Sequence, residues 1–322
     1  MPARTGPAAS LAELRARYLH GDETASAKLI AELAADPRKG AQALGRALKK
    51  RRDAARGERL RLEAMLHFER VLWQAGIKHI AGVDEVGVGP LAGPVVAAAV
   101  VLPPDIDVDR VDDSKKLDPA TREEIAAALH DRAVAIAIGA VDVADIDRLN
   151  VYQAGREAMR RAVTSLSVAP QHVLTDARAI PGLGDLPQNA FDKGDGLNYS
   201  IACASIVAKV HRDRLMCALD EQYPGYGFAE HKGYGTAKHL DAVRRLGPCP
   251  QHRMSYPAIR ELTGDAGSAF YELKQALDDA GSLRGLDDVR GRIRAAAAEL
   301  TAAEVRKLQA LVGRRRKRLT PG

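Results

Sequence analysis

Two adjacent carboxylates, Asp84 and Glu85, end an apolar run and come directly before a glycine-rich turn. Core packing does not explain a charged pair at this point, whereas loops at strand ends often carry binding and catalytic residues. Neighbouring residues of a regular strand point to opposite faces, so both carboxylates reach one site only if the strand ends or twists there. The pair therefore indicates a functional site; the alternative is a solvated turn.

The turn that follows, Gly87-Val88-Gly89-Pro90, would let a ligand approach the backbone amides, because glycine has no Cβ. It lacks the Gly-Lys-Ser/Thr ending of a nucleotide-binding P-loop and the full dinucleotide-binding fingerprint. Two glycines in a turn are weak evidence alone, so the turn is a candidate substrate-binding loop only beside the carboxylates.

Two further carboxylates lie near the ends of predicted elements. Asp176 follows the apolar run 172–175 as Asp84 follows its own, and Asp195 precedes a long helical pattern, where it could instead be a helix-start residue. Strand ends on one edge of a sheet converge. Four carboxylates suit Mg²⁺ or Mn²⁺, which prefer oxygen ligands, and permit two-metal hydrolysis of a phosphodiester. The residues thus predict a metal-dependent nuclease.

The elements that must position these residues form an α/β pattern. Short apolar runs predict strands at 80–83, 95–102, 133–141, 173–175 and, weakly, 189–191, and helical patterns cover 121–132, 152–166 and 199–223. Thr121 and Glu124 have the spacing of a capping box. The first two strands follow one another with little between them, whereas helices or loops separate the later ones. This order predicts a mixed β-sheet flanked by helices.

Helical extensions flank this domain. Apolar periodicity in residues 1–77 predicts four segments with a break at Asp36-Pro37 and, between the third segment (Leu44, Leu48) and the fourth (58–73), the basic run 49–52. Residues after Gly264 return to helix and end in the basic run 314–318. We expect a helical N-terminal extension over 1–77, a catalytic domain over 78–264 and a helical basic C-terminal extension over 265–322.

Charge is divided along the chain in the same way. Lys and Arg number 15 against 9 Asp and Glu in residues 1–77, 21 against 25 in 78–264, and 12 against 8 in 265–322. An acidic centre between basic arms is typical of a protein that holds cations centrally and meets a polyanion with its flanks. The alternative is a set of solvated helix faces.

Several classes of protein are excluded. The sequence has no run of about 18 apolar residues and no secretory signal at its start, so we expect a cytoplasmic protein without membrane association. Its three cysteines are scattered and form no CxxC pair, which predicts neither a disulfide framework nor a zinc site.

Five motifs in order make a specific resemblance. They are 82–96 (the strand end, the glycine turn and Leu-Ala-Gly-Pro-Val-Val), 113–117 (Asp-Ser-Lys-Lys-Leu), 193–195 (Lys-Gly-Asp), 201–210 (Ile-Ala-Cys-Ala-Ser-Ile-Val-Ala-Lys-Val) and 231–236 (His-Lys-Gly-Tyr-Gly-Thr). Together they resemble bacterial ribonuclease HII over about 78–262, and residues 65–69 resemble the N-terminal extension of some members. The resemblance leaves only the stretch after Gly264 uncovered.

The resemblance implies an RNase H-like fold and an endoribonuclease with Mn²⁺ or Mg²⁺ as cofactor. We expect a monomer. It would hydrolyse the RNA strand of RNA/DNA hybrids and nick duplex DNA on the 5′ side of single ribonucleotides, as ribonucleotide removal in DNA repair requires. The family's metal-site and catalytic carboxylates map onto Asp84, Glu85, Asp176 and Asp195. The family's substrate-binding positions map onto the glycine turn (Gly87, Val88, Gly89) and onto Tyr234, which would pack against the sugar after the ribonucleotide. Apart from the resemblance, Lys115, Lys193 and Lys232 are candidates to contact backbone phosphates, for which solvated loops are the alternative.

Two departures from the family pattern matter. The family turn usually reads Gly-Arg-Gly, but Val88 replaces the arginine; backbone contacts to a 2′-hydroxyl could survive this change, whereas a cationic contact to phosphate could not. Ala177 stands where glycine is common, with a small expected effect unless the position needs positive φ.

Two alternative functions follow from Val88: a non-catalytic nucleic-acid-binding relative, or a nuclease like ribonuclease HIII that recognises single ribonucleotides poorly. The four carboxylates argue against the first. The Pro90–Pro94 stretch and the lack of a large N-terminal binding domain favour HII over the second.

Overall fold

A five-stranded sheet forms the centre of the computed structural model, which describes residues 9–263, 268–298, 300 and 302–319. The strands lie in the order β3-β2-β1-β4-β5. β1 (Ile80–Val86), β2 (Val95–Val101) and β3 (Ala135–Val141) pair antiparallel, and β4 (His172–Asp176) and β5 (Gln188–Phe191) continue the sheet parallel to β1. This arrangement confirms the expected mixed sheet.

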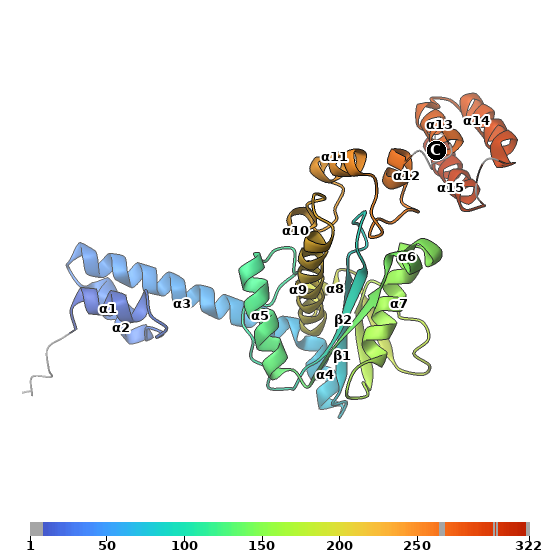
Figure 1. Cartoon of the computed structure of the whole chain (residues 1–322). Coiled ribbons are helices and arrows are strands. Elements are labelled where there is room, and N and C mark those ends of the chain that lie inside the picture. Colours follow the sequence, from blue (N-terminus) through green and yellow to red (C-terminus); the bar gives the residue numbers. More distant parts are fainter. Residues whose placement is uncertain (1–8, 264–267, 299, 301, 320–322) are drawn as a thin grey trace, which may run out of the picture.

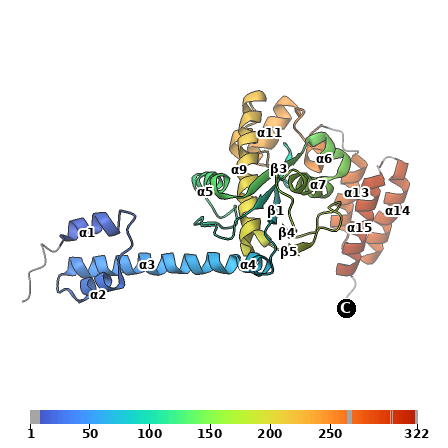
Figure 2. The same ribbon diagram turned by 90° about the horizontal axis from the view of Figure 1, so that it is seen from below.

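Helices cover both faces of the sheet (Figures 1 and 2). α9 (Tyr199–Gln222) packs on β1 and β2 and is itself covered by α5 (Pro119–Arg132), whereas α7 (Val151–Thr164) packs on the other face against β2 and β3. Every residue of β2 is buried, because the strand lies between two apolar layers. Shorter helices join these elements: α6 (Val143–Leu149), α8 (Gly194–Leu197), α10 (Phe228–His231), α11 (Ala237–Leu246) and α12 (Pro257–Thr263).

The contact between β1 and α9 depends on glycine. A Cβ at Gly82 would lie 2.2 Å from the carbonyl carbon of Ser200, so any side chain there would force the helix away from the strand. The start of α9 is also fixed by the buried carboxylate of Glu69, which lies in α4 (His67–Gln74) and accepts hydrogen bonds from the Ser200 amide at 2.8 Å and from Asn198 Nδ2 at 3.2 Å. The strand that carries Asp84 is therefore held close against α9.

The N-terminal region is helical, but its division differs from the expectation. After α1 (Leu11–Tyr18) and α2 (Ala27–Ala35), one helix of 27 residues, α3 (Lys39–Met65), replaces the expected third and fourth segments as far as Met65. The expected break at the basic run 49–52 was wrong, because these residues are good helix formers and continue the helix between two packed ends. Leu44 and Leu48 pack with α2, and Leu62 and Met65 join the core beneath the sheet. α3 thus extends as an arm (Figure 1).

The start of α5 also differs from the expectation. The helix begins at Pro119, with Asp118 as its cap accepting from the Thr121 amide at 3.0 Å, so the expected start at Thr121 was two residues late. Proline is favoured in the first turn of a helix because its missing N–H is not needed there. No helix of the described residues is long and apolar enough to cross a membrane.

The C-terminal region folds as three helices, α13 (Ser268–Asp279), α14 (Leu283–Ala295) and α15 (Ala302–Leu319), with a short 3₁₀ turn, η1 (Ala296–Ala298), after α14. They have a core of their own, separate from the cores on the two faces of the sheet. Figure 2 shows this unit on the opposite side of the sheet domain from the N-terminal arm.

We predict that Gly82→Ala destabilises the protein by at least about 3 kcal/mol, because the added carbon meets backbone rather than a movable side chain. Gly57→Ala is the matched control. Gly57 lies inside α3, and nothing lies within 4 Å of the point that an added Cβ would occupy, so this variant should gain about 0.5–1 kcal/mol from helix propensity. Urea unfolding followed by circular dichroism measures both. Equal effects of the two substitutions would contradict this account.

Candidate active site

Asp84 and Glu85 reach the open edge of the sheet from a strand that remains regular. β1 ends at Val86, one residue after the pair and directly before the glycine turn, and it stays paired with β2 as far as Val86. Asp84 lies toward α9 and lines the same hollow as Ser205 of that helix, and Glu85 lies toward α7, where Gly155 approaches its side chain. Pairing of β1 with β4 stops at Val83, so beyond this residue β1 lacks its neighbour on that side. The early end of this pairing leaves both carboxylates access to one region.

A hollow of about 280 Å³ lies at this edge. Asp84, Glu85 and Asp176 form its acidic wall. Other residues that line it are Val86, Gly87, Val88, Gly89, Ser114, Lys115, Ser205, Lys209, Arg212 and Tyr234. A second hollow of about 230 Å³ shares Glu85, Val88 and Asp176 with the first. Val88 therefore stands where the two hollows meet.

Asp195 joins the group through Asp176 and Lys115. The amide of Gly194, the first residue of α8, donates to Asp176 Oδ1 at 2.6 Å, so the end of β4 fixes the start of the helix that carries Asp195. Asp195 is buried, and its Oδ2 lies 3.2 Å from the ammonium of Lys115. The structure thus brings the four predicted carboxylates and Lys115 to one edge of the sheet.

The carboxylates raise one another's pKa. Burial, followed by the charge of Glu85, raises the pKa of Asp84 well above its ordinary value. Burial and the charge of Asp176 raise the pKa of Glu85, and burial raises that of Asp176. Each raised pKa means that the ionised carboxylate is disfavoured in the folded protein. A bound cation would offset this free-energy cost.

The donor set fits a hard divalent cation, because it consists of carboxylate oxygens facing a hollow. In the described part of the chain, no three Asp, Glu, His or Cys side chains are close enough to hold one ion as they stand. The carboxylates would have to close around the ion. Asp84, Glu85, Asp176 and Asp195 are the residues that would hold it.

Two buried arginines, which the sequence analysis missed, fix the glycine loop. Arg253 donates to the carbonyls of Gly87 at 2.6 Å, Val88 at 3.2 Å and Gly93 at 2.8 Å. Arg212 donates to three other carbonyls around the loop, those of Ala92, Pro94 and Lys232. A side chain at Gly87, whose φ is 90°, would overlap Arg212. The two guanidinium groups therefore hold the loop through backbone carbonyl groups in and around it.

The amides of the loop are left available to a ligand. Among the described residues, none accepts a hydrogen bond from the N–H of Val88 or Gly89. The Val88 carbonyl receives a further hydrogen bond from the Tyr256 hydroxyl at 2.8 Å, which fixes its peptide from the other side. The loop thus presents rigid donors, as oxyanion and hydroxyl sites require.

Tyr234 lies beside this loop with its ring partly exposed, close to Gly89. Its carbonyl contacts His239 Nδ1 at 2.9 Å, and His239 Nε2 lies 3.1 Å from His252 Nε2. Burial lowers the pKa of His239 to about 4, so the imidazole stays neutral near pH 7. The buried histidines therefore fix the peptide that carries Tyr234.

The other two predicted lysines do not line the acidic hollow. The ammonium of Lys232 donates to the Ala229 carbonyl at 2.6 Å and lies in a different hollow, and Lys193 caps α8 in a left-handed conformation with φ 59°. Lys209 lines the acidic hollow instead and pairs with Asp213 at 2.7 Å. Ala177 has φ 54°, so this position does need the conformation that glycine adopts without strain.

Comparison with known proteins decides the family. The model of the family described as ribonuclease HII matches residues 81–259, and that of the ribonuclease HII N-terminal domain matches 11–73. The chain belongs to the ribonuclease HII family. It is similar to ribonuclease HII of Myxococcus xanthus (51% identical over 256 residues, 79% of this chain and 87% of the relative) and of an Anaeromyxobacter species (50% over 255 residues, 79% and 81%).

A solved structure agrees. The crystal structure of ribonuclease H2 from Pyrococcus horikoshii matches with a TM-score of 0.50 and 27% identity, over 58% of this chain and 98% of that one. The expected RNase H-like fold and the expected family are thereby confirmed. As a ribonuclease HII, the chain is an endoribonuclease of RNA/DNA hybrids, in a family that depends on divalent metal ions.

We predict that Asp84→Asn stabilises the metal-free protein by about 1 kcal/mol at pH 7–8. The folded-state pKa of Asp84 is raised above its unfolded value, so ionisation lowers stability above that value, and the loss disappears as the pH falls below it. The gain should therefore shrink toward acid pH. Urea unfolding in EDTA at several pH values measures it.

The exposed Asp185→Asn is the matched control, with the same chemical change and no expected gain. Millimolar Mg²⁺ or Mn²⁺ should raise the melting temperature of the unmodified protein more than that of Asp84→Asn. A variant that is less stable than the parent at pH 8 would contradict the buried-repulsion account.

Proposed function

We propose that this chain nicks duplex DNA on the 5′ side of a single ribonucleotide, in addition to cutting the RNA strand of hybrids, and that Asp84, Glu85, Asp176 and Asp195 hold two divalent cations for this reaction. The observation that carries the proposal is one hollow lined both by acidic side chains and by a rigid loop with available amides beside an exposed tyrosine ring. All four carboxylates come from one chain, which supports action as a monomer.

The acidic wall would supply the chemistry of hydrolysis. When bound, Mg²⁺ or Mn²⁺ ions would supply Lewis acidity at the attacking water and at the leaving oxygen. The carboxylates on β1 and β4 would hold these ions from the edge of the sheet, and Asp195 would do so from the start of α8. Lys115, whose ammonium lies at Asp195, is placed to contact a phosphate of the cleaved strand.

The glycine loop and Tyr234 would select the nucleotide. The N–H groups of Val88 and Gly89 can donate to a 2′-hydroxyl, an acceptor that deoxyribose lacks. Tyr234 would lie against the next sugar, where a second 2′-hydroxyl would crowd its ring. The side chain of Val88 offers no charge to a phosphate, so selection by this loop rests on its backbone.

The test uses two labelled duplexes with Mg²⁺ or Mn²⁺, one with a single ribonucleotide in DNA and one with a long RNA strand. We expect both to be cut, the first on the 5′ side of the ribonucleotide. Asp84→Asn should lower both rates by at least about 100-fold, because it removes a charged ligand from the site. Cutting of the long hybrid alone would favour the HIII-like alternative and refute single-ribonucleotide recognition.

We predict that Val88→Arg raises cleavage at a single ribonucleotide by about three- to tenfold, because a guanidinium adds a charge-assisted contact to phosphate. The backbone conformation should survive, since Arg253 and Tyr256 hold the Val88 carbonyl rather than its side chain. Val88→Gln, similar in length but uncharged, is the control. Rates and affinities equal to those of the parent would count against this interpretation of the loop.

A further inference from the structure

The C-terminal three-helix unit has no part in the site described above. It lies beyond residue 259, where the match to the family ends, and it has its own apolar core. An ion pair of 2.5 Å joins Arg260 of α12 to Glu304 of α15, and both side chains are mostly covered. The unit is therefore attached to the sheet domain through a shielded contact, in addition to the chain connection.

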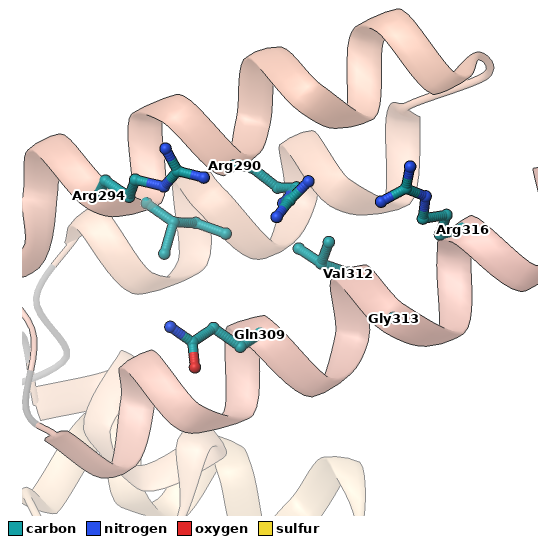
Figure 3. A pocket seen from close by; sticks show the side chains of 7 residues that line it. Arg290, Arg294, Gln309, Val312, Gly313 and Arg316 are labelled. Atoms are coloured by element: carbon teal, nitrogen blue, oxygen red, sulfur yellow. The ribbon is translucent and has the colours of Figure 1, made fainter.

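Between α14 and α15 lies a hollow of about 380 Å³ whose polar groups are cationic or neutral (Figure 3). Arg290 and Arg294 come from α14, and Arg316 and Gln309 from α15. Among the described residues, no acidic side chain lines it. Arginine binds phosphate through parallel hydrogen bonds, so this set is suited to phosphate groups.

Among the residues that the structure describes, only a weak ion pair holds Arg290 in the hollow. It contacts Asp287 at 3.1 Å, one turn earlier on the same helix, and both side chains are open to solvent. Exposed pairs of this kind contribute less than about 1 kcal/mol, so a phosphate can compete for the guanidinium. Gly313 lies in the lining of the hollow, and nothing occupies the space within 4 Å of the position its Cβ would take. A ligand can therefore approach α15 closely there.

Positive charge continues past the hollow along α15. Arg315 is used internally, donating to the carbonyls of Asp278 at 2.8 Å and Ala280 at 3.1 Å, and this fastens the end of α15 to α13. Arg314, Lys317 and Arg318 are exposed beside it. A row of cations on a fastened helix matches a partner with repeated phosphates better than it matches a small anion.

We propose that this surface, the Arg290/Arg294/Arg316 hollow with the end of α15, binds backbone phosphates of the nucleic-acid duplex outside the acidic hollow of the active site. The inference rests on the proposed function only for the identity of the duplex. Contacts to phosphates are independent of sequence and sensitive to salt. The surface would therefore add affinity, and selection of the ribonucleotide would remain with the acidic hollow.

The test compares charge changes inside and outside the hollow in the full chain. Gly313→Glu places a carboxylate in the hollow, and Gly291→Glu places one on α14 outside it; both glycines are exposed with open space around them, so both variants should fold. Arg290→Gln with Arg294→Gln removes two charges from the hollow, and Arg284→Gln with Arg292→Gln removes two from the same helix outside it. Circular dichroism checks the fold of each.

Affinity is measured by fluorescence anisotropy in EDTA, where nothing is cut, with a duplex of about 30 base pairs, on the order of 100 Å long. We expect Gly313→Glu and the inner double variant to weaken binding by about five- to tenfold and the inner double variant to lower the slope of log K against log salt by about one to two. Each outer control should change affinity by less than about twofold. In cleavage assays of the same duplex, the loss should appear in KM rather than in kcat.

Inner and outer variants with equal affinity and equal salt slopes would overturn the proposal. So would variants that bind inorganic phosphate less tightly but the duplex as tightly as the parent, because the hollow would then be a small-anion site. Because binding is measured without cleavage, a chain that binds the duplex through this surface but fails to nick at a ribonucleotide would contradict the proposed function and leave this inference standing.

Discussion

Burial of Asp84 beside other carboxylates is the constraint on which the site depends. Like charges in a covered position disfavour ionisation, as the raised pKa values of Asp84, Glu85 and Asp176 reflect. The fold holds the backbone of β1 in place. Gly82 lets the strand lie close against α9, and Glu69 fixes the first turn of that helix. The same rigidity keeps these backbones in place while the side chains close around a cation, which would offset the repulsion.

A second set of buried charges has the opposite role. Arg212 and Arg253 are almost fully covered, and within the described part of the chain all of their hydrogen bonds but one go to backbone carbonyls, most of them of the glycine loop and its neighbours. Burial of a guanidinium is tolerated when its donors are satisfied in this way. The loop geometry is consequently set by residues far away in sequence, and the side chain at position 88 is free to vary. This explains how Val88 can stand there without collapse of the loop.

Much of the fold could be predicted from the sequence because the apolar runs of the strands and the periodicity of α7 and α9 are local signals. The four carboxylates could be predicted as a group because each stands at or near the end of such an element. Other features depend on contacts that no local pattern encodes. Arg253 lies more than 150 residues from the loop it holds, and the direction of Lys232 is decided by the Ala229 carbonyl. The continuity of α3 through residues 49–52 was missed because the segments were placed by their apolar residues, which this run of charges interrupts, although each of its residues favours helix.

The distribution of charge places duplex binding and hydrolysis in different parts of the chain. A site built of carboxylates repels the phosphate backbone that it must approach, and the whole of residues 78–264 carries 21 Lys and Arg against 25 Asp and Glu. Cations in the site would reduce this repulsion only near the scissile bond, because charge is screened within about 10 Å at ordinary salt. Attraction over the length of a duplex must then come from elsewhere in the chain. The two basic flanks, on opposite sides of the sheet domain in Figure 2, are where the sequence places it. An endonuclease arranged in this way can change its affinity through its flanks while the geometry of the carboxylate edge stays unchanged.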